Sequence, residues 1–126
     1  MVTPPREFLI LEHSSGRYSG LLVGEDGVTG IPAATLLTLT LTLYVVQTNG
    51  TIAYVNGRND QNVLNANNVT VDVNGNLVWS IQTLDTGLQQ ALPEERHIAL
   101  FQFTAPNGVV GKHEMILIVK ALLEVP

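Results

Sequence analysis

The sequence predicts an all-β protein, a sandwich of antiparallel strands, from three observations. The dipeptide Asn-Gly, a strong signal for a hairpin turn, occurs four times, at residues 49–50, 56–57, 74–75 and 107–108. Apolar and polar residues alternate between Leu37 and Leu43, which is the pattern of a half-buried strand. No segment carries a helical stripe of apolar residues over three turns. Short strands at regular spacing therefore favour a β-sandwich.

The first thirty residues differ from the rest of the chain. Residues 8–12 (FLILE) and 18–24 (YSGLLVG) are two short candidate strands, and the glycine-rich residues 24–30 follow them. We interpret residues 1–30 as an N-terminal arm, joined at about Gly30 to a compact domain of residues 31–126. A second interpretation stays open, in which the same residues supply the first strands of the sandwich.

The domain of residues 31–126 consists of alternating segments joined by turns. The polar segment 56–68 is a loop, and residues 85–96 are a connection with room for one helical turn. In the strand before that connection, Leu77, Trp79 and Ile81 share one face and are expected in the core. The expected strands are residues 37–43, 51–55, 69–73, 76–84, 97–103 and 114–125.

The composition predicts a surface that is polar but weakly charged. Hydrophobic residues make up 45% of the 126 residues and charged residues only 13%, well below the usual quarter. Thr, Asn, Gln, Ser and Gly must therefore cover most of the surface. Such a surface is common where a protein packs against neighbours.

The charge pattern excludes several classes of partner. Acidic residues outnumber basic ones by 11 to 6, and no Lys/Arg cluster is present, so we expect no nucleic-acid binding. The chain has no cysteine, which excludes disulfides and thiolate chemistry. The longest apolar run, Met115–Val119, is too short to cross a membrane, and we expect neither a signal peptide nor membrane binding.

Two histidines, His97 and His113, flank the last two expected strands and are a candidate site. If the turn is centred near Pro106 and Asn107, His97 lies across from about Ile116 and His113 from about Leu100. The two side chains would be roughly 10 Å apart at ~3.4 Å per residue, too far to share a metal ion or a proton. We expect both histidines at strand ends, half in solvent.

Other candidate chemical motifs are incomplete. The segment Asp72–Asn76 (DVNGN) is similar to the start of a calcium loop, but its glycine is misplaced and position twelve is Thr83 instead of Glu. Glu94 and Glu95 are neighbours in an extended segment, so their carboxylates point apart. We therefore expect no catalytic residue, no metal site and no cofactor.

The closing hairpin has a more informative pattern, because it is apolar on both faces. Residues 115–119 are apolar throughout, and Ile98 and Leu100 alternate with further apolar residues on the facing strand. Either the N-terminal arm or another subunit must cover the second face, and both alternatives stay open. The residues expected to contact a partner are Phe101, Phe103, Ile116 and Ile118 in the hairpin and Phe8, Leu9, Ile10 and Leu11 in the arm.

Three stretches carry a resemblance to a known family: residues 39–44 (LTLTLY), 57–85 and 95–122. Their characteristic pieces are Asn62–Asn65, the turn at Gly75 that leads to Trp79, His97 with residues 99–101, and Gly111–Glu114. Over residues 31–124 the chain resembles small immunoglobulin-like virion proteins encoded in the structural gene clusters of tailed bacteriophages. The cysteine pair and tyrosine corner of antibody domains are absent.

The resemblance implies an immunoglobulin-like sandwich and a non-enzymatic structural role in the virion, after synthesis in the bacterial host cytoplasm. It implies a place at the head–tail junction or in the tail, or else on the capsid as a decoration protein. The implied partners are other virion structural proteins, copies of this chain, or both, in a homo-oligomeric arrangement. A different class also stays open: an adhesion or carbohydrate-binding module using Tyr44, Tyr54 and the loop Gly57–Asn68, which would need a concave aromatic platform.

Overall fold

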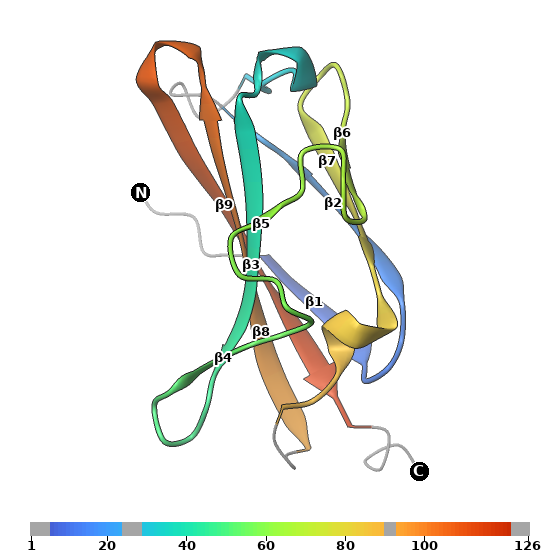
Figure 1. Cartoon of the computed structure of the whole chain (residues 1–126). Helices are drawn as coiled ribbons and strands as arrows, with labels where there is room; N and C mark the ends of the chain where they lie inside the picture. Colours follow the sequence, from blue (N-terminus) through green and yellow to red (C-terminus); the bar gives the residue numbers. More distant parts are fainter. Residues whose placement is uncertain (1–5, 24–28, 90–92, 122–126) are drawn as a thin grey trace.

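The computed structural model describes residues 6–23, 29–89 and 93–121, which form a sandwich of two β-sheets (Figure 1). Within these ranges there is no α-helix, and the only helical pieces are three short 3-10 turns, at Ala33–Thr35, Thr83–Thr86 and Pro106–Gly108. The all-β prediction is confirmed. The strands are β1 (Arg6–Leu11), β2 (Gly16–Leu21), β3 (Thr38–Val46), β4 (Ile52–Tyr54), β5 (Gln61–Asn62), β6 (Val69–Val71), β7 (Asn76–Ile81), β8 (Glu94–Ala105) and β9 (Val109–Lys120).

The two sheets have the strand order of an immunoglobulin-like fold. The larger sheet runs β1-β9-β8-β3-β4, with the short β5 also paired with β3, and the smaller sheet runs β2-β7-β6. Figure 1 shows β3, β8 and β9 in one layer and β2, β6 and β7 in the other. This is the division of strands between the two sheets of an immunoglobulin domain. The sheets are not purely antiparallel, since β1 pairs with β9 in parallel.

The N-terminal residues supply the first strands of the sandwich. β1 lies on the edge of the larger sheet, whereas β2 pairs with β7 in the smaller one. Ile10, Tyr18 and Leu22 are buried in the common core. For residues 6–23, the structure agrees with the second interpretation, in which they supply the first strands of the sandwich. Residues 24–28 of the glycine-rich segment lie outside the described residues.

The core lies between the sheets, around Trp79. Leu77, Trp79 and Ile81 are each at most 1% exposed, which confirms the expected register of β7. The Trp79 ring meets the ring of Phe101 edge to face, with 5.8 Å between the centroids, a favourable aromatic geometry. Leu39, Leu41 and Leu43 bury the alternate positions of β3, but Leu37, expected on the same face, precedes that strand and is exposed.

The Asn-Gly dipeptides do form turns, but three of them differ from the expected two-residue geometry. Gly50, Gly75 and Gly108 have positive φ, whereas Asn49 and Asn74 do not. The loops are longer than two residues, as in the three residues between β8 and β9, and such loops need one left-handed residue. Only the dipeptide at 56–57 has two positive φ values, and it joins β4 to β5, which both pair with β3.

Candidate interaction surface

The larger sheet turns an apolar face away from the core, and we call its outward residues on β1, β9, β8, β3 and β4 the outer face. One cross-strand row on it runs Tyr54, Tyr44, Ile98 and Ile116. Nearby, Val46 pairs with Ile52 and Ile118 pairs with Leu9. The strands alternate, so residues between these positions, such as Val45 on β3 and Leu117 on β9, point into the core and are buried.

Several apolar side chains of the outer face are open to solvent. Leu9 is 64% exposed, Ile52 55%, Val46 53% and Tyr54 48%. Ile98, Leu100, Ile116 and Ile118 are half-buried beside them. Apolar residues that are adjacent on five neighbouring strands, instead of scattered singly, indicate a surface for protein contacts.

The closing hairpin is apolar on both sides, as expected, but its two sides have different roles. Ile116 and Ile118 lie on the outer face, whereas Phe101 and Phe103 are at most 2% exposed and belong to the core. The expectation of partner contacts at Phe101 and Phe103 is therefore wrong for this fold. The alternation of β8 sends every second residue inward.

The first strand divides in the same way. Leu9 and Leu11 point outward and are exposed, but Ile10 is buried and Phe8 packs against the core. Phe8 and Ile10 are thus not available to a partner, which corrects that expectation. Because β1 pairs beside β9, it widens the sheet and does not cover the outer face.

Val46 and Ile52 were not among the residues expected from the sequence. The signal was present, because Val45-Val46 breaks the alternation that precedes it, and Ile52 follows directly after the first Asn-Gly turn. A hairpin drawn through that turn places Ile52 across from Val46, as observed. Two apolar residues at the end of an alternating strand therefore indicated a second apolar face here.

We call the end of the outer face where β8 begins and β9 ends its lower part, as it lies in Figure 1. The charged side chains there are paired with one another. Arg96 on β8 forms an ion pair with Glu7 on β1, so its side chain crosses the outer side of β9. Lys120 Nζ lies 3.8 Å from Glu94 Oε1. These are exposed pairs and contribute little to stability. Because of this pairing, the apolar residues that lie between the two ion pairs have no unpaired charge from these four side chains beside them.

A hollow of about 330 Å³ opens on this face beside β3 and β8. Val46, Ile98 and Ile116 contribute apolar walls, and Glu94, Glu95 and Arg96 contribute the carboxylates and the guanidinium group. Each of these three groups already has a partner within the chain. Neither Tyr44 nor Tyr54 lines the hollow, so it is not the aromatic platform of a carbohydrate site. Its size and lining suit an apolar side chain of a partner.

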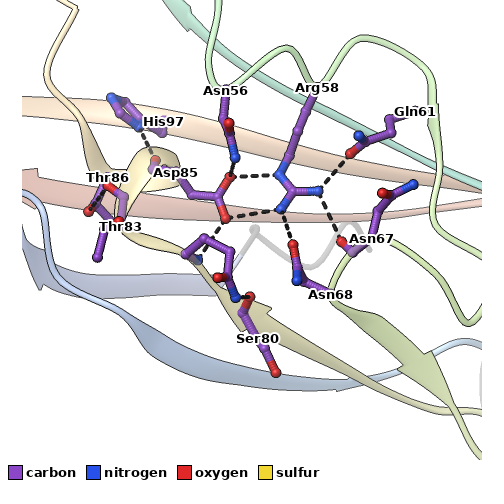
Figure 2. A network of polar contacts seen from close by, with 11 residues as sticks. Asn56, Arg58, Gln61, Asn67, Asn68, Ser80, Thr83, Asp85, Thr86 and His97 are labelled. Carbon is purple, nitrogen blue, oxygen red and sulfur yellow. Dashed lines mark hydrogen bonds and ion pairs between the residues drawn. The ribbon is translucent and has the colours of Figure 1, made fainter.

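A buried ion pair, which the sequence did not predict, joins two loops at the side of the core. Figure 2 shows Arg58 and Asp85 facing each other, with loop residues around the guanidinium group. Arg58 Nε donates to Asp85 Oδ1 at 2.6 Å, and Nη2 donates to Oδ2 at 3.2 Å. The two side chains are 2% and 0% exposed. The sequence alone places Arg58 in a polar loop, where an exposed arginine is the usual expectation.

Both partners of this pair are fully hydrogen-bonded. The five N–H groups of Arg58 reach Asp85, Gln61 Oε1, Asn68 Oδ1 and the carbonyl of Asn67. The Asp85 carboxylate also accepts from Asn56 Nδ2 and from the backbone N–H of Gln82. The guanidinium carbon lies 5.9 Å from the centre of the Trp79 ring. Because all of their hydrogen-bonding groups have partners, these two charges can be buried inside the sandwich. The ion pair also ties the loop 56–68 to the turn before β8.

The two histidines are not solvent-exposed strand flanks. His97 is fully buried; its Nδ1 donates to the carbonyl of Asp85 at 3.0 Å, and its Nε2 lies 2.6 Å from Glu95 Oε1. His113 is half-buried, with Nε2 2.6 Å from the hydroxyl oxygen of Tyr18. The expected register was off by one, since His97 pairs with Leu117 and His113 with Phe101.

Both histidines face the core side of the larger sheet, and each makes a local structural contact. The described part of the chain holds no group of three or more His, Cys, Asp or Glu side chains placed to bind a metal ion. Within residues 6–23, 29–89 and 93–121, no helix has the length and apolar character needed to span a bilayer. The outer face remains the main candidate for function.

Comparison with known proteins assigns no family to this chain. No family model matches the sequence, and no curated protein matches it. The solved structure of murine CRIg is similar at 13% sequence identity, with 93% of this chain and 92% of that chain covered and a TM-score of 0.43. The immunoglobulin-like assignment of the present chain rests on its own strand order.

Proposed function

We propose that the protein is a non-enzymatic structural component of a tailed-phage virion and acts through protein–protein contacts made by the outer face. The observation that supports contacts is the apolar row from Tyr54 to Ile116, which crosses four strands of one open face. An open apolar surface of this kind favours association. The virion setting is supported by the sequence resemblance, and we place the protein at the head–tail junction or in the tail, with capsid decoration as the alternative.

The weakly charged composition fits the same proposal. Only 13% of the residues are charged, and the charges on the lower outer face already form ion pairs with each other. A surface with few charges has few charged groups to remove from water when a neighbour covers it. Proteins that stay in a fixed assembly bury faces of this kind permanently.

The test is incorporation into particles. Phage particles are assembled in cells that supply the protein as wild type, as Ile52→Asp or as Val73→Asp, and the protein is quantified in purified particles by mass spectrometry. Ile52 lies on the outer face, whereas Val73 is equally open, at 77% exposed, but lies in the turn between β6 and β7. We expect wild type and Val73→Asp in the particles and at least about tenfold less Ile52→Asp. Absence of the wild-type protein from particles would refute the virion role.

A second candidate function is supported by one observation. Tyr44 and Tyr54 are cross-strand partners on the outer face, and paired aromatic rings are a common platform for sugars. Against it, neither tyrosine lines the hollow on this face. Binding of the purified protein to a glycan array, lost on Tyr54→Ala, would favour the adhesion module over the structural role.

A further inference from the structure

We infer that the partner of the outer face is a second copy of this chain, bound face to face in a two-fold symmetric dimer. The inference rests on the proposed function in so far as both use this face. It goes further because it names the occupant. Three properties of the face support it: its charge balance, its internal ion pairs and its size.

The outer face is electrically neutral although the chain is acidic. The net charge of the chain is −5, so two copies repel each other on average. The outer face carries equal numbers of acidic and basic residues. The acidic ones are Glu7, Glu94 and Glu114, and the basic ones are Arg96, Lys112 and Lys120. The charge that repels a second copy therefore lies elsewhere, and this face is where two copies can approach.

The pairing of these charges favours the same occupant. Arg96 with Glu7 and Lys120 with Glu94 are satisfied within one copy. A strongly charged partner would have no unpaired charge to meet at the lower part of the face, and electrostatic complementarity would then select another surface. A second copy presents an apolar row of the same composition. In a two-fold dimer the same patch is used on both sides.

The size of the face is sufficient for a stable dimer. The five strands together contain 42 residues. At ~3.4 Å per residue along a strand and about 4.8 Å between strands, they cover a planar area of about 700 Å². This area lies within the roughly 600–1,000 Å² that each partner buries in an interface of standard size.

The experiment is sedimentation equilibrium of the purified full chain over a range of concentrations. We compare wild type with Ile52→Asp and Val46→Arg, two substitutions of opposite charge at exposed positions of the outer face. The charge-matched control is Val73→Asp, which is open but outside the face. Melting temperatures identify any variant that fails to fold. We use two charge signs so that a change in net charge alone cannot explain the result.

We expect wild type and Val73→Asp to be dimers, and both outer-face variants to stay folded with at least about a tenfold higher dissociation constant for the dimer. A wild type that remains monomeric at millimolar concentration overturns the inference, and so does a dimer that both outer-face variants leave unchanged. The two proposals can fail separately. A monomer that still enters particles through this face removes only the self-association, and a dimer absent from particles removes only the virion role.

Discussion

The ring of Phe103 lies over Gly111, its direct cross-strand partner in the β8–β9 hairpin. A Cβ atom on Gly111 would come within 2.2 Å of the Cζ atom of that ring. Phe103 is 2% exposed and surrounded by core residues, so the ring cannot move away freely. Glycine at 111 is thus needed for close approach of a side chain and not for a turn.

Replacement of Gly111 by Ala should therefore destabilise the fold. The added methyl group must displace the Phe103 ring inside a packed core, and such overpacking costs about 1–3 kcal/mol. The measurement is the urea midpoint of the variant. Gly87→Ala is the matched control, because its Cβ would meet its nearest atom at 3.8 Å, which is ordinary contact. Equal midpoints for the two variants would mean that the ring shifts without cost.

The buried ion pair should be far more sensitive to single substitutions than an exposed one. Arg58→Met leaves the Asp85 carboxylate buried without its cation, and the expected loss is about 3–5 kcal/mol of unfolding free energy. Arg96→Met breaks the exposed pair with Glu7, with partners 52% and 48% exposed, and should cost at most about 1 kcal/mol. Urea denaturation of both variants gives the comparison. A similar, small loss in both would show that Asp85 finds other partners.

The double variant Arg58→Met/Asp85→Leu separates pairing from burial. When both charges are replaced by apolar side chains, no unpaired charge remains in the core, so the loss should be smaller than for Arg58→Met alone. The same denaturation series measures it. A double variant less stable than the single one would mean that the loop 56–68 depends on the pair for its conformation.

The turn between β6 and β7 should make a small contribution to acid stability. The backbone N–H of Asn76, its side-chain amide and the backbone N–H of Asn74 donate to the carboxylate of Asp72 and hold its pKa below the ordinary value of 3.8. A carboxylate with a lowered pKa stabilises the fold above its unfolded pKa, and this contribution is lost as the pH falls through the folded pKa. Here the loss begins near pH 3.8 and extends below it.

A carbon-detected NMR titration of the Asp72 side chain checks this directly. The expected midpoint in the folded protein lies below 3.8. Asp72→Asn keeps an acceptor oxygen but cannot ionise, so its unfolding free energy should fall less than that of the wild type as the pH falls from about 4 towards the acid transition. A folded midpoint above 3.8 would contradict the role of the three donors.

Removal of residues 1–23 should unfold the protein. The deletion takes away β1 from the larger sheet and β2 from the smaller one, together with Tyr18 and Leu22 from the core. Circular dichroism and thermal melting of the truncated chain test this expectation. A cooperative native-like transition would show that β6, β7 and the other five remaining strands form a sandwich alone.

Local patterns in the sequence predicted the strands well. The alternation from Leu39 to Leu43 and the Asn-Gly turns identified β3, β4, β7, β8 and β9, and the phase of β7 placed Trp79 in the core. The apolar character of both hairpin faces also followed from the sequence. These features depend on residues that are close together in the chain, and the alternation of side chains along a strand is sufficient to predict them.

Long-range pairings could not be predicted in this way. No turn signal joins β1 to β9, because parallel neighbours need no local connection. Arg58 and Asp85 are 27 residues apart, and nothing near either residue indicates burial. His97 was expected at the end of a strand, but β8 begins at Glu94 and buries every second residue, so His97 lies in the core. The register of β8 and β9 was off by one residue, and that error grouped Phe101 and Phe103 with Ile116 and Ile118 on one face.

The parallel pairing of β1 with β9 also determines how the fold bears mechanical load. Tension applied at Arg6 and at Lys120 pulls the two strands in opposite directions along their length, since Arg6 pairs with Met115 and Leu11 with Lys120. Every hydrogen bond of this ladder is then loaded at the same time, in shear. An antiparallel pair pulled from one end opens bond by bond and yields at a lower force. The six-residue ladder therefore acts as a clamp between the first and last strands of the domain.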